Sequence, residues 1–173
     1  KNWALPTIIV GLIISLWSAI QTAFIVAEKG QIIYKLAGWS SDRFPIGIEY
    51  MVDHLNAIVL IMITAVSLFV AIYSKHSVDK ECPENKTAFY TLFSLLVTGL
   101  TGMTITGDAF NLYVMLEVSA LSSYALIAFG RSRAYLATFN YVIMGSIGAC
   151  FYLLGVGYVF LKTGALNMLE ISS

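Results

Sequence analysis

Charged side chains are scarce in this sequence. Asp, Glu, Lys and Arg make up 12% of its 173 residues, against roughly 25% in an average soluble domain. Ten acidic residues balance ten basic ones, so no excess of positive charge points to nucleic acid as a partner. Hydrophobic residues account for 58% of the chain. This composition is typical of a membrane protein.

Cysteine is also rare, and its placement excludes further classes of site. Cys82 lies in a polar segment and Cys150 in an apolar one, so the two are expected at different membrane depths. They share no spacing typical of metal ligands. We therefore predict neither a disulfide nor a metal site, and no cofactor-binding motif occurs in the sequence.

Long apolar stretches are what the sequence has in abundance. Five of them reach the roughly 20 residues that a helix needs to cross about 30 Å of hydrocarbon. Soluble domains lack five such stretches. We predict an all-α, polytopic transmembrane bundle in the cell membrane, with residues 1–173 forming a single transmembrane domain. The predicted spans cover residues 4–27, 55–74, 87–107, 109–129 and 135–161.

The segments between these spans suggest a topology. Residues 28–53 form the longest one and are predicted to be an extramembrane loop, in which the alternation over residues 44–52 favours a short strand or hairpin. Asp53 precedes the second span and is well placed as its N-cap. Six Lys and Arg residues fall on the side that carries Lys1, against four on the other, which favours a cytoplasmic start. The chain begins with Lys1 instead of Met, and we expect a fragment of a longer protein.

Glu117 is the only formally charged side chain inside the five apolar stretches. A carboxylate at the centre of a membrane-spanning helix costs at least about 2.5–3.5 kcal/mol on insertion scales, so it should face protein or water. With the fourth helix starting near Asp108, Glu117 lies about 13 Å along the helix axis, near the bilayer midplane. We hypothesise that it belongs to an ion or proton path.

Tyr113 and Tyr124 are the first candidates for the same path. They lie four residues before and seven residues after Glu117, which places all three on one helical face. Two phenol groups could therefore donate hydrogen bonds to the carboxylate or to water beside it. The alternative for Tyr124 is an aromatic anchor at the membrane interface.

Polar residues of the neighbouring spans are further candidates. Thr98 and Thr101 belong to a stripe of small and hydroxyl residues on the third span, which we expect to pack against the fourth. The alternative is that each hydroxyl bonds to a carbonyl of its own helix. Asn140 in the fifth span is either a hydrogen-bonded link between helices or a position on a water chain. Four glycines of that span predict a face suited to tight packing, Gly145, Gly148, Gly155 and Gly157.

One run of the sequence resembles a known family. Residues 106–126, TGDAFNLYVMLEVSALSSYAL, are similar to a signature of the antiporter-like membrane subunits, and GIEYMVDHLNA at residues 47–57 and the stretch 141–168 agree with it. This family comprises the proton-translocating subunits of respiratory complex I, related subunits of membrane-bound hydrogenases and large subunits of multi-subunit cation/proton antiporters. The residues of these stretches are most like those of the D-type antiporter subunit, and the similarity covers the N-terminal part of such subunits.

The resemblance carries structural implications. It implies a 14-helix antiporter-like fold built from two inverted five-helix repeats, in which the spans here correspond to helices 2–6. It also implies that Glu117 pairs with a lysine on the seventh helix, which would lie beyond Ser173. Asp108 would cap the fourth span or lie at a channel mouth. Many relatives have a lysine where this sequence has Asn140, so the resemblance does not imply an identical proton route.

The function implied is that of a Na⁺/proton antiporter subunit with a Glu-centred polar path. Its expected partners are other membrane subunits, the lipid bilayer, protons and Na⁺. One alternative is a proton-pumping membrane subunit of a complex I-like NADH/quinone oxidoreductase or of a membrane-bound hydrogenase, where the electron chemistry would belong to other subunits. A second alternative is a truncated, non-conducting scaffold, motivated by the absent seventh helix and by Asn140.

Overall fold

Five long helices dominate the computed structural model, which describes residues 3–36, 48–81, 83–130 and 133–172. Each helix is long and apolar enough to cross a membrane, which confirms the predicted multi-pass bundle. Their bounds are α1 (Ala4–Lys29), α2 (His54–Glu81), α3 (Lys86–Ile105), α4 (Ala109–Ala128) and α5 (Ala134–Thr163). A short sheet and a five-residue helix, α6 (Met168–Ser172), complete the described part.

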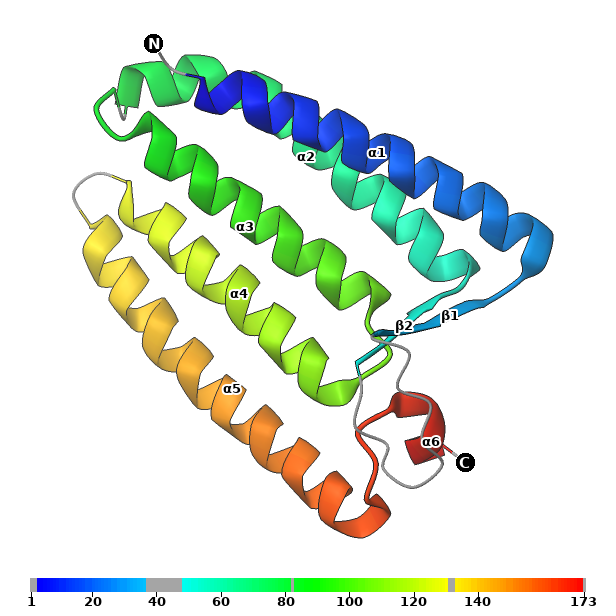
Figure 1. Ribbon diagram of the computed structural model, residues 1–173. Helices are drawn as coiled ribbons and strands as arrows, with labels where there is room; N and C mark the ends of the chain where they lie inside the picture. Colours follow the sequence, from blue (N-terminus) through cyan, green and yellow to red (C-terminus); the bar gives the residue numbers. More distant parts are fainter. Residues whose placement is uncertain (1–2, 37–47, 82, 131–132, 173) are drawn as a thin grey trace.

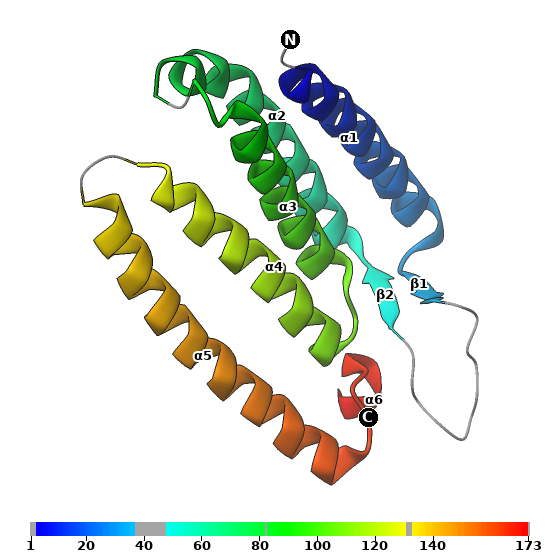
Figure 2. The same ribbon diagram turned by 60° about the vertical axis from the view of Figure 1, so that its left-hand side comes forward.

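The long helices alternate in direction along the chain (Figure 1). α1 packs on α2, and α3, α4 and α5 follow side by side in chain order (Figure 2). The main apolar cluster joins the first three helices and includes Leu12 of α1, Ala71 of α2 and Phe93 of α3. Among the long helices, α5 packs chiefly against α4, and Ala149 is its only buried residue among those described. Its outer apolar side chains are suited to lipid.

α2 extends past the predicted end of its span, from residue 74 to Glu81. The predicted boundary followed the first charges, Lys75 and His76, but charged residues end an apolar stretch without ending a helix, since Lys and Glu are good helix formers. Asp79 of this extension forms an ion pair with Lys86 at the start of α3. We call this end of the molecule the Glu84 end, after the connection between the two helices.

A hairpin lies at the opposite end (Figure 1). Strand β1 (Ile32–Lys35) pairs antiparallel with β2 (Glu49–Val52), with Ile32 opposite Val52. This confirms the predicted hairpin, although residues 44–47 lie outside the described residues. Asp53 follows β2 directly, and its Oδ1 accepts a hydrogen bond of 2.8 Å from the backbone N–H of Asn56. It thus caps α2 as expected.

β2 also joins two segments that are distant in the sequence. The backbone N–H of Gly107, between α3 and α4, donates to the carbonyl of Glu49 at 2.8 Å, and the N–H of Met168 donates to the carbonyl of Gly107 at 2.9 Å. The Glu49 carboxylate is buried and accepts a hydrogen bond from the side-chain amide of Asn167. This junction fixes the start of α4 relative to the end of α5.

Candidate functional site

The start of α4 is set by a buried polar cap. Oδ1 of Asp108 accepts a hydrogen bond of 2.6 Å from the backbone N–H of Asn111, whose side-chain amide donates to Oγ1 of Thr106 at 2.9 Å. Asp108 thereby satisfies a backbone donor that the helix itself leaves unpaired. With this start, Glu117 is the ninth of the 20 residues of α4.

One face of α4 is closed by α3. A Cβ added to Gly99 would lie 2.7 Å from the Cβ of Ser119, and one added to Gly102 would lie 2.5 Å from Sδ of Met115. Glu117 is two residues from both Met115 and Ser119, and so points about 200° away from each around the helix. The carboxylate is therefore on the side of α4 that does not meet α3.

The side chain of Glu117 lies instead along the contact between α4 and α5. Tyr113 stacks on Tyr152 of α5 with ring centroids 6.2 Å apart and an angle of 9° between the planes. Further along, Tyr124 packs edge-on against Tyr141 of α5 at 4.8 Å and 73°. Glu117 is half-buried between these two levels. We call the two tyrosine pairs and Glu117 the α4–α5 seam.

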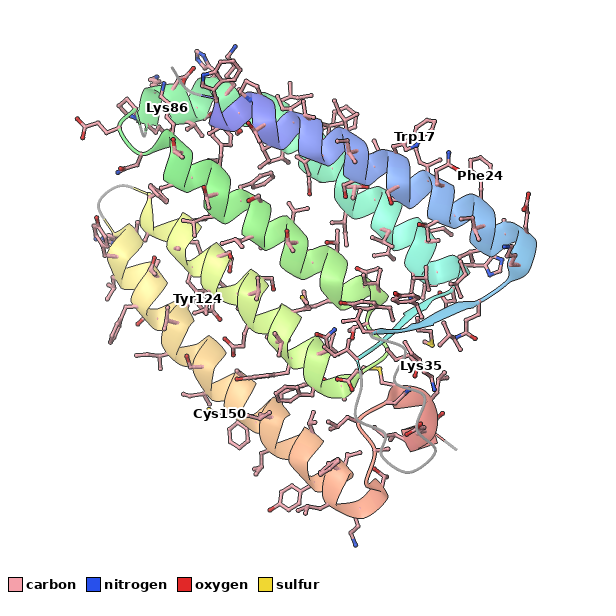
Figure 3. The ribbon with its side chains drawn as sticks, viewed as in Figure 1. Trp17, Phe24, Lys35, Lys86, Tyr124 and Cys150 are labelled. Carbon is pink, nitrogen blue, oxygen red and sulfur yellow. The ribbon has the colours of Figure 1, made fainter. Side chains whose placement is uncertain are left out.

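Both tyrosines of α4 are electrostatic neighbours of the carboxylate. The Tyr113 phenol, one turn away, lies next to Glu117, and Tyr124 interacts over a longer range with Glu117 as well as with Tyr141. Tyr124 is buried and sits between α4 and α5 (Figure 3), whereas Trp17 and Phe24 of α1 point away from the bundle. The structure thus brings Tyr113, Tyr124 and Glu117 together on one face.

Gly145 makes room for Tyr124. A Cβ added at Gly145 would overlap the Tyr124 hydroxyl oxygen and lie 2.8 Å from Cζ of Tyr124, so the two side chains cannot both keep these positions. The predicted small-residue packing of α5 holds at this position. At Gly148, Gly155 and Gly157 an added Cβ would meet no atom of the described residues within 4 Å, so tight packing at these glycines stays a prediction.

Gly145→Ala is expected to displace the Tyr124 side chain and to lower the free energy of unfolding by about 1–3 kcal/mol, the usual cost of overpacking. Tyr124→Phe removes the atom nearest the new methyl group, so the double variant should lose less stability than the sum of the two single variants. The measurement is a double-mutant cycle from thermal denaturation of the full-length subunit in detergent. Additive losses would contradict this contact, and Gly148→Ala is the matched control.

Thr98 and Thr101 lie away from Glu117. They line a groove between α3 and α1, together with Gly11 and Ser15, and their hydroxyls donate to carbonyls of α3 itself, at 2.8 Å for Thr98 and 3.0 Å for Thr101. The prediction that this stripe packs on α4 is wrong for these threonines. The contact is made by glycines of α3, because a helix backbone can approach a residue without a side chain more closely.

Asn140 is also apart from the seam. Its side chain is exposed, and it precedes Gly145 by five residues, which turns it about 140° away from Tyr124 around the helix. Sequence reasoning missed Tyr141 and Tyr152, which do face α4. Their spacing of four before and seven after Gly145 was the available signal, since residues so spaced share a helical face.

No group of three or more His, Cys, Asp or Glu side chains that could hold a metal ion occurs in the described residues. Cys150 is a free, exposed thiol. Cys82 lies outside the described residues. What the seam can offer chemically is one carboxylic acid and several phenol hydroxyls, which can bind, donate and accept protons.

Two family models match the sequence. The first, the N-terminus of chain 5 of NADH-ubiquinone oxidoreductase (complex I), covers residues 39–76. The second, the transmembrane family of NADH:quinone oxidoreductases and Mrp antiporters, covers residues 106–173. The second match includes α4, α5 and the whole of the seam.

Curated relatives include subunits of NADH-quinone oxidoreductases and subunits of Na⁺/H⁺ antiporters. The N-type subunit of the NADH-quinone oxidoreductase of Desulforudis audaxviator is 43% identical over 139 residues, which are 80% of this chain and 27% of the relative. The D-type subunit of the Na⁺/H⁺ antiporter of Bacillus subtilis is 30% identical over 164 residues, 94% of this chain and 31% of the relative. The chain therefore spans 27–31% of the length of these relatives.

Solved structures agree with the fold over nearly the whole chain. The membrane-bound sulfane sulfur reductase, an archaeal respiratory membrane complex, superposes with a TM-score of 0.88 at 34% identity, covering 99% of this chain and 34% of its counterpart. The Mrp complex from a Dietzia species superposes with a TM-score of 0.83 at 25% identity, covering 95% and 30%.

Proposed function

This chain belongs to the antiporter-like membrane subunit family, and we propose that it is the N-terminal part of a proton-translocating subunit in a multi-subunit complex of the cell membrane. Its partners in this proposal are other membrane subunits, the surrounding lipid and the transported protons. The observation that carries the proposal is the placement of Glu117 in the middle of α4, half-buried between Tyr113 and Tyr124 on the helix face that meets α5.

The physical argument starts from the cost of a charge in hydrocarbon. An ionisable group inside a transmembrane segment persists where it faces a protein interior or water, and such groups commonly mark ion and proton routes. Among the described residues, no Lys, Arg or His lies on the membrane-embedded part of the five helices. Glu117 is the one carboxylic acid on that part of the described helices, which makes it the natural centre of a polar path.

For the transported ions, we propose that a monovalent cation, Na⁺, is exchanged for protons. The support is the similarity of the chain to the D-type antiporter subunit over 94% of its length and to the Mrp complex in fold. The alternative is proton pumping driven by electron transfer in other subunits, supported by the 43% identity to the N-type subunit of the NADH-quinone oxidoreductase. The non-conducting scaffold offers no reason for a carboxylate in the middle of a membrane-spanning helix, as at Glu117.

The test uses the full-length subunit assembled with its partners in everted membrane vesicles. With an imposed pH gradient and no electron donor, addition of Na⁺ should release protons, recorded with a pH-sensitive dye. Vesicles lacking only this subunit are the control. Proton movement that requires an electron donor and is indifferent to Na⁺ would replace the antiport proposal by the redox alternative. No proton movement under either condition would leave the scaffold.

A further inference from the structure

We propose that protons reach Glu117 from the Glu84 end along the α4–α5 seam, by way of the hydroxyls of Thr138, Tyr141 and Tyr124. This inference rests on the proposed function and deepens it, because it assigns the access route and adds two residues of α5 to the path. The route uses the face of α5 that meets α4, on which Thr138, Tyr141 and Gly145 follow at intervals of three and four residues.

The route is a row of three hydroxyls, and the first of them is buried without a hydrogen-bonding partner. Oγ1 of Thr138 is the one buried side-chain nitrogen or oxygen among the described residues that forms no hydrogen bond. Ser119, Ser122 and Ser123 on the facing helix all donate to carbonyls of α4, so hydroxyls in this region ordinarily find a partner. An unsatisfied buried hydroxyl is costly. Thr138 is therefore a site that a water molecule would stabilise.

The next two hydroxyls of the row belong to Tyr141 and Tyr124. Their rings are in edge-on contact at 4.8 Å, and the Tyr124 hydroxyl oxygen lies against Gly145 of α5. Tyr124 is also an electrostatic neighbour of Glu117. A buried water needs two to four polar partners. The phenols of the seam, with Thr138 before them and Glu117 beyond them, supply such partners in sequence.

The row leads into a pocket at the Glu84 end. This pocket is lined by Glu81, Glu84 and Asn85 at its polar side and by Ala125, Ala128 and Tyr135 toward the seam. Tyr135 precedes Thr138 by three residues, so the two are neighbours on α5. The pocket thus reaches within one helical turn of Thr138, the first hydroxyl of the route. The distribution of Lys and Arg predicts that this end is cytoplasmic.

The seam is closed on the hairpin side of Glu117. Tyr113 and Tyr152 stack there, and the Tyr152 hydroxyl donates to the carbonyl of Ala109 at 3.1 Å. That hydroxyl is already engaged. The geometry therefore favours access to Glu117 from the Glu84 end.

The test compares conservative variants in the full-length, assembled complex. Thr138→Val keeps the shape of the side chain and removes the hydroxyl, and it should slow proton flux about five- to tenfold, the effect expected from losing one hydrogen-bonding site. Thr138→Ser restores a hydroxyl and should keep near-normal flux. Tyr141→Phe should slow flux to a similar extent. Tyr158→Phe is the matched control, because Tyr158 is exposed on α5 away from the seam.

The outcomes separate this inference from the proposed function. Blue native electrophoresis first establishes that each variant assembles. If Thr138→Val does not assemble, the flux of Tyr141→Phe decides whether the route is correct. Normal flux in the assembled Thr138→Val and Tyr141→Phe variants, with Glu117→Gln inactive, would overturn the route and leave the function standing. If proton flux is slowed as much in Thr138→Ser as in Thr138→Val, the route is also overturned, because restoring the hydroxyl would then have no effect. Normal flux in Glu117→Gln would overturn the proposed function.

Discussion

Glu117→Gln is expected to reduce proton flux through the assembled complex at least about a hundredfold, the scale on which removal of a proton-transferring group acts. Gln has nearly the same shape as Glu and can still form hydrogen bonds with Tyr113, so the packing of α4 on α5 should survive. It cannot bind or release a proton near neutral pH. The measurement is the initial rate of proton movement in everted vesicles, normalised to the amount of assembled complex.

Two further variants sharpen this expectation. Glu117→Asp keeps the carboxyl group but retracts it by one methylene from Tyr113, so part of the flux should remain. Glu28→Gln removes a carboxylate from an exposed position at the end of α1 and should leave the rate unchanged. If Glu117→Gln moves protons as fast as the unaltered complex does, the Glu-centred path is wrong.

Much of the fold could be predicted because it depends on local properties of the chain. The five spans follow from the length of uncharged stretches, and the cap at Asp53 follows from one acidic residue before an apolar run. The end of α2 could not be predicted this way. Hydropathy reports where a helix would leave the bilayer, whereas the helix itself continues to Glu81 through residues that water solvates.

The candidate site could be predicted only where it lies on a single helix. Tyr113, Glu117 and Tyr124 share a face because of the helical repeat alone. Tyr141 and Tyr152 depend on how α5 is placed against α4, which the junction through Gly107 and Asn167 helps to fix. The spacing of Tyr141 and Tyr152 around Gly145 indicates a shared helical face, but it does not tell that this face meets α4. For the same reason the sequence could not tell that Thr98 and Thr101 face α1.

The close contact between α3 and α4 is the second feature with a large expected effect. Gly99→Ala should lower the free energy of unfolding by about 2–3 kcal/mol, in the upper part of the range for overpacked cores. Its new Cβ would lie 2.7 Å from the backbone nitrogen of Ser119 and 2.9 Å from the carbonyl oxygen of Met115. Backbone atoms of a helix cannot rotate away, so the two helices must separate.

Gly102→Ala is the matched control, one turn along the same face of α3. Its Cβ would lie within 2.8 Å of two atoms, both in the flexible side chain of Met115, and methionine adapts readily to a changed contact. We expect a loss below about 1 kcal/mol, which thermal denaturation of the full-length subunit in detergent would resolve from the effect of Gly99→Ala. Equal losses would show that α4 is not held by this backbone contact.

The same pair of variants links stability to the site. In a bilayer, helix association depends on close packing because lipid chains are as apolar as the side chains they replace. Separation of α3 from α4 would push α4 toward α5. This would disturb the contacts of Tyr113 with Tyr152 and of Tyr124 with Tyr141. Gly99→Ala should therefore also slow proton flux in the complex that assembles, whereas Gly102→Ala should not. A destabilised Gly99→Ala complex with unchanged flux per assembled unit would show that the α4–α5 seam tolerates this displacement.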